Sequence, residues 1–83
     1  MKITYSAWLK DTVGIGEETV TLPDDVRTVG MLIDWLGSRG QAHARAFEFI
    51  EVVKVAVNKV YVDNDHAVTD ADEVILFPPI AGG

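Results

Sequence analysis

The sequence ends in an apolar run, two prolines and two glycines: Glu73-Val74-Ile75-Leu76-Phe77-Pro78-Pro79-Ile80-Ala81-Gly82-Gly83. Four consecutive apolar residues, Val74 to Phe77, are typical of a strand that is buried on both faces and therefore central in its sheet. The two prolines cannot add ladder hydrogen bonds, so the strand is expected to end at them. Beyond Ile80 the side chains shrink to one methyl group and then to none. The pattern predicts a central strand that leads through a stiff, apolar exit into a bare tail.

The first half of the sequence alternates as strands do. From Lys2 to Lys10, alternate residues are apolar, which predicts a first strand. A second strand is expected over residues 18–23, so that the two form an N-terminal hairpin. Gly14 and Gly16 lie between them and are free to adopt the positive φ angles of a turn.

A helical pattern separates this hairpin from the later strands. Thr28 is a natural N-cap for a helix whose buried face comprises Val29, Leu32, Ile33 and Leu36, and Gly37 and Gly40 are candidate stops. Residues 41–49 are rich in helix formers and predict a short second helix. The period then returns to two over residues 53–57, and Asn58-Lys59 is expected to turn the chain into a short strand, Val60-Tyr61-Val62.

The order strand, strand, helix, strand, short strand, strand predicts an α+β roll. Its mixed sheet, with one main helix and a short second helix, resembles the ubiquitin-like β-grasp fold. We expect a single β-grasp domain over residues 1–80 and a flexible Gly-Gly tail over residues 81–83.

Composition restricts the function. With 83 residues and a net charge of −6, the chain is one acidic domain with no electrostatic reason to bind nucleic acid or an anionic membrane. The sequence has no cysteine, which removes disulfides, thiolate metal sites and cysteine nucleophiles. No apolar run has the length of a signal peptide or a membrane span, so a cytoplasmic location is expected.

The motifs that usually carry side-chain chemistry are incomplete. Gly14-Ile15-Gly16 lacks the third glycine of a dinucleotide loop, because Thr19 occupies that position. The acidic run from Asp63 has Val74 at its twelfth position, where a calcium loop requires glutamate. His43 and His66 have neither the spacing nor the neighbours of a metal site. We therefore expect no metal and no bound cofactor.

The main chain's own end is the remaining candidate for a reactive group. A tail without bulky side chains can thread a narrow tunnel in a partner, and glycine allows an active site to approach the backbone closely. The α-carboxylate of Gly83 is a poor electrophile until ATP converts it to an acyl-adenylate. A sulfur nucleophile can then displace AMP and leave a thiocarboxylate, a reaction that needs no catalytic side chain on the carrier itself.

Residues 56–83 carry a family pattern that matches this chemistry. The segment AVNKVYVDNDHAVTDADEVILFPPIAGG resembles the small subunit of molybdopterin synthase, and the N-terminal KITYSAWLKDTVG is a looser match. The resemblance implies a non-catalytic sulfur carrier whose C-terminal glycine is adenylated, converted to a thiocarboxylate and inserted into the large subunit of the synthase. The implied partners are that large subunit and an enzyme that adenylates and sulfurylates the tail, using ATP and a sulfur donor.

The resemblance also assigns residues. Gly82 and Gly83 match the essential tail, and Phe77 matches an aromatic residue of the interface. The apolar exit and Tyr61, which stands where relatives have an apolar contact residue, complete the expected interface: Tyr61, Phe77, Pro78, Pro79, Ile80 and Ala81. Ala71 departs from the family, whose turn usually has glycine at this position.

Three other functions fit a glycine-ended β-grasp domain. A sulfur carrier for thiamin thiazole synthesis has the same fold and the same terminal chemistry, although it seldom has the Phe-Pro-Pro step. A ubiquitin-like modifier would instead form isopeptide bonds through Gly83. A binding module of another class would have an idle tail, which could be removed without loss of function.

Overall fold

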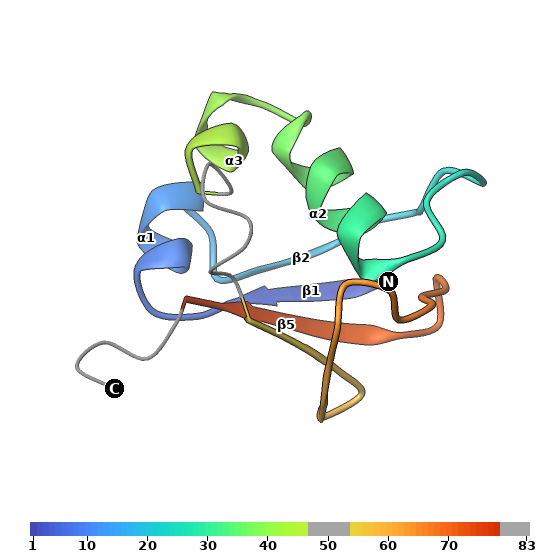
Figure 1. Ribbon diagram of the computed structural model, residues 1–83. Helices are drawn as coiled ribbons and strands as arrows, with labels where there is room; N and C mark the ends of the chain where they lie inside the picture. Colours follow the sequence, from blue (N-terminus) through green and yellow to red (C-terminus); the bar gives the residue numbers. More distant parts are fainter. Residues whose placement is uncertain (47–53, 79–83) are drawn as a thin grey trace.

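The computed structural model describes residues 1–46 and 54–78 of the chain (Figure 1). A five-stranded mixed sheet has the strand order β2-β1-β5-β3-β4. The strands and helices follow one another as β1 (Lys2–Tyr5), α1 (Trp8–Val13), β2 (Glu17–Thr19), α2 (Val29–Gly37), α3 (Gln41–Ala46), β3 (Lys54–Val57), β4 (Val60–Val62) and β5 (Glu73–Phe77).

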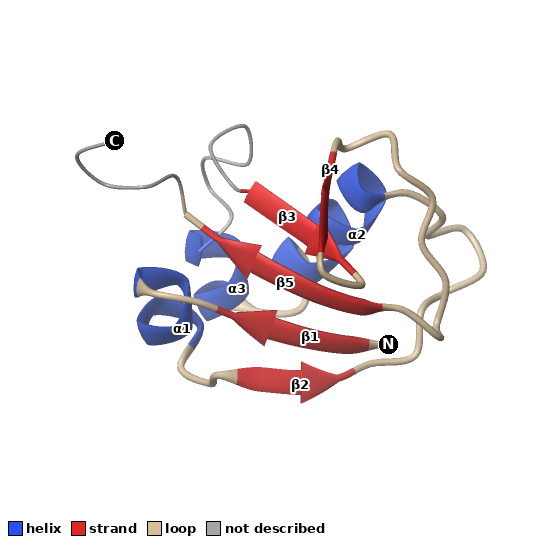
Figure 2. Ribbon diagram, turned by 90° about the horizontal axis from the view of Figure 1, so that it is seen from below, coloured by secondary structure: helices blue, strands red, loops and turns tan. Residues whose placement is uncertain are grey.

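Strand β5 lies at the centre of the sheet, as its apolar run predicted. It pairs in parallel with β1 and antiparallel with β3. The three helices lie over one face of this sheet, and the view from the other face has the strands in front (Figures 1 and 2). A mixed sheet covered by helices on one side confirms the α+β roll. We call the two sides of the sheet the covered face and the open face.

The expectation that β5 is buried on both faces was wrong for one of them. Val74 and Leu76 are 1% and 0% exposed, whereas Ile75 and Phe77 are only half-buried. Successive side chains of a strand point to opposite faces, so the first pair belongs to the covered face and the second pair to the open face. None of the helices within residues 1–46 and 54–78 therefore covers the apolar residues of the open face.

The N-terminal region differs most from its prediction. Alternation suggested a strand from Lys2 to Lys10, but β1 ends at Tyr5 and helix α1 begins at Trp8. Leu9 and Val13, four residues apart, share one face of this helix and are buried in the core. Leu9 fits the alternation of a strand, but it is also the first core residue of a short helix. Alternation therefore could not distinguish a strand from a helix at this position.

The predicted hairpin of β1 and β2 exists as an antiparallel pair, but its connection contains α1. Gly14 takes the left-handed conformation, with φ 96°, and its N–H bonds to the carbonyl oxygen of Lys10. It therefore ends a helix, as glycine often does, instead of turning a hairpin. Strand β2 covers only Glu17–Thr19, so the expected extension to Pro23 was also wrong.

The main helix confirms its pattern. Thr28 caps α2 by accepting a hydrogen bond from the Met31 backbone N–H at 3.3 Å. Its four predicted core residues are all buried: Val29, Leu32, Ile33 and Leu36. The short second helix exists as α3, whereas Phe47 to Phe49 of its predicted range lie outside the described residues.

The β3–β4 hairpin also follows its prediction. Asn58 and Lys59 have φ angles of 51° and 72°, which a tight turn between right-twisted strands requires. Val55 and Val57 face the core, with exposures of 3% and 4%. Of the predicted divisions of the chain, the tail at residues 81–83 and the boundary at residue 80 lie outside the described residues.

Candidate functional site: the exit of the central strand

The candidate site begins where β5 delivers the chain out of the sheet. Phe77 is the last residue of the strand and is half-buried, and Pro78, which follows it, is buried. Pro79, Ile80, Ala81, Gly82 and Gly83 lie outside the described residues, so their expected roles stay predictions. Because β1 on one side and β3 on the other both hydrogen-bond to β5, the point at which the chain leaves is fixed by the middle of the sheet.

Tyr61 and Phe77 come together on the open face. Their rings meet edge to face, with centroids 5.4 Å apart and planes inclined at 74°. Tyr61 remains 73% exposed and its neighbour Val60 is 62% exposed. Edge-to-face contact orients both rings while leaving most of Tyr61 available to a partner. The structure thus joins two of the residues that the sequence assigned to one interface, although Tyr61 and Phe77 are 16 positions apart in the sequence.

The strand register extends this patch across the sheet. Tyr61 pairs with Ala56, Ala56 with Ile75, and Ile75 with Thr4. These four residues therefore form one cross-strand row that includes the ring of Tyr61. Two apolar side chains, Ala56 and Ile75, lie at its centre.

Helix α1 begins at the same end of the sheet. The Ser6 N–H donates to the carbonyl oxygen of Leu76 at 3.0 Å, so the chain stays beside β5 almost to the helix. Ala7 then turns the chain with φ 55° and ψ −136°, a conformation that glycine adopts far more readily. Such a residue stores about 1–3 kcal/mol of backbone strain. Trp8, the next residue, is 45% exposed.

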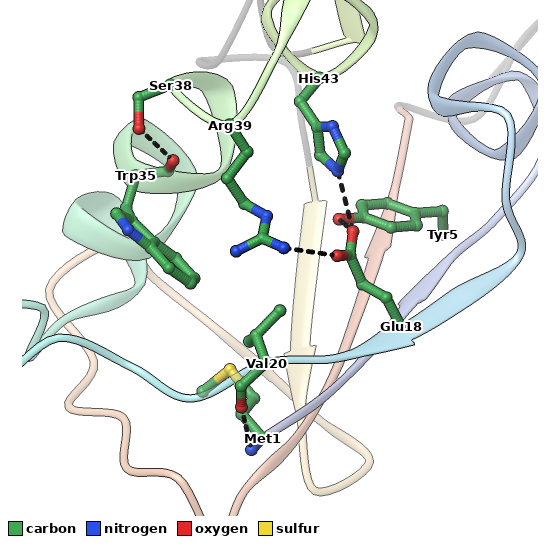
Figure 3. A network of polar contacts seen from close by, with 8 residues as sticks. All are labelled: Met1, Tyr5, Glu18, Val20, Trp35, Ser38, Arg39 and His43. Atoms are coloured by element: carbon green, nitrogen blue, oxygen red, sulfur yellow. Dashed lines mark hydrogen bonds and ion pairs between the residues drawn. The ribbon is translucent and has the colours of Figure 1, made fainter.

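A polar network lies on the covered face of the sheet (Figure 3). The carboxylate of Glu18 accepts a hydrogen bond from the Tyr5 hydroxyl at 2.6 Å and lies 2.8 Å from Nε2 of His43. A guanidinium nitrogen of Arg39 is 3.3 Å from the other carboxylate oxygen, and Arg39 also lies over the ring of Trp35. Residues from β1, from α3 and from the turn after α2 thus converge on one carboxylate of β2.

This network perturbs the protonation of two groups. Burial, followed by the hydrogen bond to the Glu18 carboxylate, raises the pKa of Tyr5 far above its ordinary value. Burial alone would raise the pKa of Glu18, but hydrogen bonds from His43 and Tyr5, with the charges of His43 and Arg39, outweigh it and lower that pKa. Glu18 is therefore held ionised, which suits a structural tie between helices and sheet. Glu18 and His43 are 25 residues apart in the sequence, so no local pattern indicated that they meet.

Two carboxylates of the acidic loop before β5 accept hydrogen bonds that hold the loop to the fold. Asp72 accepts hydrogen bonds from the Asn58 side chain and the Thr69 backbone, both at 2.9 Å, and Asp70 accepts one from the Leu22 backbone at 2.7 Å. Among residues 1–46 and 54–78, no group of three acidic or histidine residues could hold a metal ion. Ala71 does not have a positive φ, so alanine fits the turn where relatives usually have glycine.

The helices within the described ranges are too short or too polar to cross a membrane. The exposed Trp8 is the feature of the exit that the sequence did not assign, because alternation placed this residue within a strand. Trp35 is partly buried against the core.

Comparisons with known proteins agree with this geometry. The ThiS family matches residues 3–83. Over 83 residues, covering 100% of this chain and 99% of the relative, the chain is 34% identical to the molybdopterin synthase sulfur carrier subunit of Escherichia coli K12. The protein of the same name from Haemophilus influenzae is 28% identical over 83 residues, again covering 100% of this chain and 99% of the relative.

Solved structures share the fold. The crystal structure of SAMP1 from Haloferax volcanii superimposes with a TM-score of 0.76 at 28% identity, covering 100% of this chain and 98% of the other. A putative molybdopterin converting factor subunit 1 from Pyrococcus furiosus gives a TM-score of 0.69 at 31% identity, with 95% of each chain covered. The fold, the register and the match over residues 3–83 lead to one conclusion: this chain is a ubiquitin-like β-grasp protein and belongs to the ThiS family.

Proposed function

We propose that this chain is the sulfur carrier subunit of molybdopterin synthase. The observation that carries the proposal is the family match over residues 3–83, which includes the Gly82-Gly83 end, together with relatives of that name aligned over their full length. The open face supports it, because Phe77 and Tyr61 form an aromatic pair beside the strand that leads to the tail.

In this role the chain supplies the carboxylate of Gly83 and a folded domain that presents it to the partner enzymes. An activating enzyme directs a Gly83 carboxylate oxygen to the α-phosphorus of ATP, and pyrophosphate leaves. Hydrosulfide from the sulfur donor then attacks the acyl carbon of the adenylate, AMP leaves, and loss of the sulfur-bound proton gives the thiocarboxylate. ATP and the sulfur donor belong to the activating enzyme, and this use of ATP favours the cytoplasm. The chain itself contributes no acid, base or cofactor.

The large subunit of the synthase is the partner that receives the charged tail. A solved complex of subunits 1 and 2 of the molybdopterin-converting factor from Helicobacter pylori contains a chain with the same fold, at a TM-score of 0.63 and 19% identity. For this chain we propose that the large subunit binds the open face, accepts the tail and supplies the catalytic groups that pass sulfur to a cyclic pyranopterin precursor. The expected contacts are Tyr61, Phe77, Pro78, Pro79, Ile80 and Ala81.

Mass spectrometry of the intact protein tests the chemistry. Incubation with ATP, the activating enzyme and a sulfur donor is expected to add the mass of one oxygen-to-sulfur exchange, localised to the C-terminal peptide. Addition of the large subunit and precursor is expected to return the mass to its starting value. Sulfur on a side chain, or no sulfur with a cognate activating enzyme, would contradict the proposal.

Tail length provides a second test of the same proposal. Deleting Gly83 moves the carboxylate back by up to about 3.6 Å, and misplacement of a reacting group on that scale costs about 100-fold or more in rate. One residue added after Gly83 is expected to be as damaging. An idle tail predicts the opposite result, near-normal cofactor synthesis from both variants.

A protein modifier is the second candidate, since the structural neighbour from Haloferax volcanii is also described as small archaeal modifier protein 1. That function predicts isopeptide bonds between Gly83 and lysines of other proteins, which peptide mass spectrometry detects as a lysine carrying the tail. A thiamin-type carrier is distinguished from a molybdopterin synthase subunit by the reaction it supports. Its thiocarboxylate would support thiazole synthesis and not the transfer of sulfur to the pyranopterin.

A further inference from the structure

The start of α1 and the end of β5 are neighbours. Strands β1 and β5 run parallel with Tyr5 opposite Leu76, and the next residue, Ser6, still donates its N–H to the Leu76 carbonyl at 3.0 Å. Trp8 opens the helix two residues later. In Figure 2, α1 lies at the end of the sheet from which the chain leaves β5. Whatever receives the chain at this exit therefore also approaches the first turn of α1.

Trp8 is held at this exit at a cost. It is 45% exposed, although Leu9, the next residue, is 0% exposed in the core. Ala7 reaches the helix only through φ 55°, in the region that favours glycine. Strained residues of this kind persist when the surrounding structure over-determines them, and they gather at functional sites. Two independent observations, an exposed indole and a strained residue immediately before it, thus point to the same place.

The indole N–H of Trp8 makes no hydrogen bond within residues 1–46 and 54–78. Tryptophan is enriched in binding hot spots, where its ring fills an apolar pocket and its N–H finds an acceptor. The chain already presents an aromatic pair, Tyr61 and Phe77, at the end of β5. Trp8 would give a partner a second anchor on the other side of the exit.

We propose that Trp8 is a docking residue for the large synthase subunit, filling an apolar pocket that contains an acceptor oxygen and lies beside the entrance to its tail tunnel. This inference rests on the proposed function and extends it from the open face of the sheet to helix α1. Contacts at Trp8 and at the aromatic pair would fix the orientation of the chain on its partner, and with it the direction of the tail. Contact through the sheet alone would allow the chain to rotate about a single contact.

Titration calorimetry with the cognate large subunit tests the proposal. Trp8→Ala is expected to weaken binding at least about thirtyfold, the loss typical of an aromatic hot spot. The matched control is Met31→Ala on α2, because Met31 is equally exposed at 47% but belongs to the main helix; its affinity is expected to stay within about twofold of the parent. Circular dichroism of both variants establishes that they are folded. Equal affinities of the parent, Trp8→Ala and Met31→Ala would overturn the inference and leave the proposed function intact, whereas a parent that does not bind would overturn both.

Fluorescence provides a second measurement that does not depend on a truncated side chain. Trp35→Phe leaves Trp8 as the sole tryptophan of the chain. Addition of the large subunit, with its own tryptophans replaced or its spectrum subtracted, is expected to shift the Trp8 emission to shorter wavelength as the indole leaves water. Unchanged emission in a formed complex would overturn the inference. A shift with the activating enzyme and none with the large subunit would also overturn the inference, since it would assign Trp8 to the activating enzyme.

Discussion

The covered and open faces of the sheet are built from the same strands but do different work. On the covered face, Leu76 is 0% exposed, and the carboxylate of Glu18 contacts three side chains from other parts of the chain. On the open face, Phe77 is half-buried beside the ring of Tyr61, which is 73% exposed. The contrast teaches that residues adjacent in sequence divide between stability and binding, so single substitutions can address one without the other.

The largest effect on stability is expected from Leu76→Ala. This residue is fully buried, and truncation of a core leucine lowers the free energy of unfolding by about 2–5 kcal/mol. Urea unfolding followed by circular dichroism measures the loss. A change under about 1 kcal/mol would contradict the assignment of Leu76 to the core.

Phe77→Arg, one residue further along the strand, is expected to affect binding more than stability. Because Phe77 is only half-buried on the open face, the domain is expected to stay folded, with a loss of about 1–2 kcal/mol. Binding to the large subunit is expected to vanish, since a charge replaces an apolar contact at the centre of the proposed interface. A folded variant that binds normally would remove Phe77 from that interface.

A smaller difference is expected between Glu18 and its neighbour Glu17. Glu18→Gln removes a charge that holds hydrogen bonds from two side chains, which is expected to cost about 1–3 kcal/mol in the free energy of unfolding. Glu17→Gln is the matched control, because Glu17 is 64% exposed and makes only a surface ion pair with Lys2 at 3.5 Å. Its cost is expected to stay under about 1 kcal/mol. Equal costs would refute the distinction between the two faces.

The smallest effect is expected in the dependence of stability on pH. The pKa of Glu18 is lowered in the folded chain, so between the folded and the ordinary value the unfolded chain binds a proton that the folded chain does not. The stabilisation from Glu18 is therefore complete above the ordinary pKa and is lost as the pH falls through the lowered one. The stability difference between the parent and Glu18→Gln is expected to shrink from about pH 6 to about pH 3. A constant or growing difference would contradict this assignment.

Sequence periodicity predicted the elements whose patterns had no rival. Thr28 and the apolar stripe of α2, the turn at Asn58-Lys59 and the central place of β5 are local signals, and all were confirmed. Helix α1 was missed because six residues are too few for a helical period to outweigh alternation. The open side of β5 was missed because an apolar run does not reveal whether a second layer of this chain or a partner covers it.

The candidate site was predicted only in part. The contact between Tyr61 and Phe77 agrees with the interface that the resemblance implied, but the burial of Pro78 and the exposure of Trp8 depend on how the strands end. The network around Glu18 joins residues far apart in sequence, and no local pattern encodes such a meeting. Long-range side-chain contacts of this kind follow from the fold and could not be read before it.

The central place of β5 also sets the order of events during synthesis. This strand is the last to be translated, yet both β1 and β3 need it as their neighbour. Until it emerges from the ribosome, these two strands have unpaired edges and the core lacks Val74 and Leu76, so the nascent chain is expected to remain open. The sheet closes only when the residues that lead to the tail have also been made. A chain whose translation has not reached β5 therefore cannot form the sheet that positions the exit.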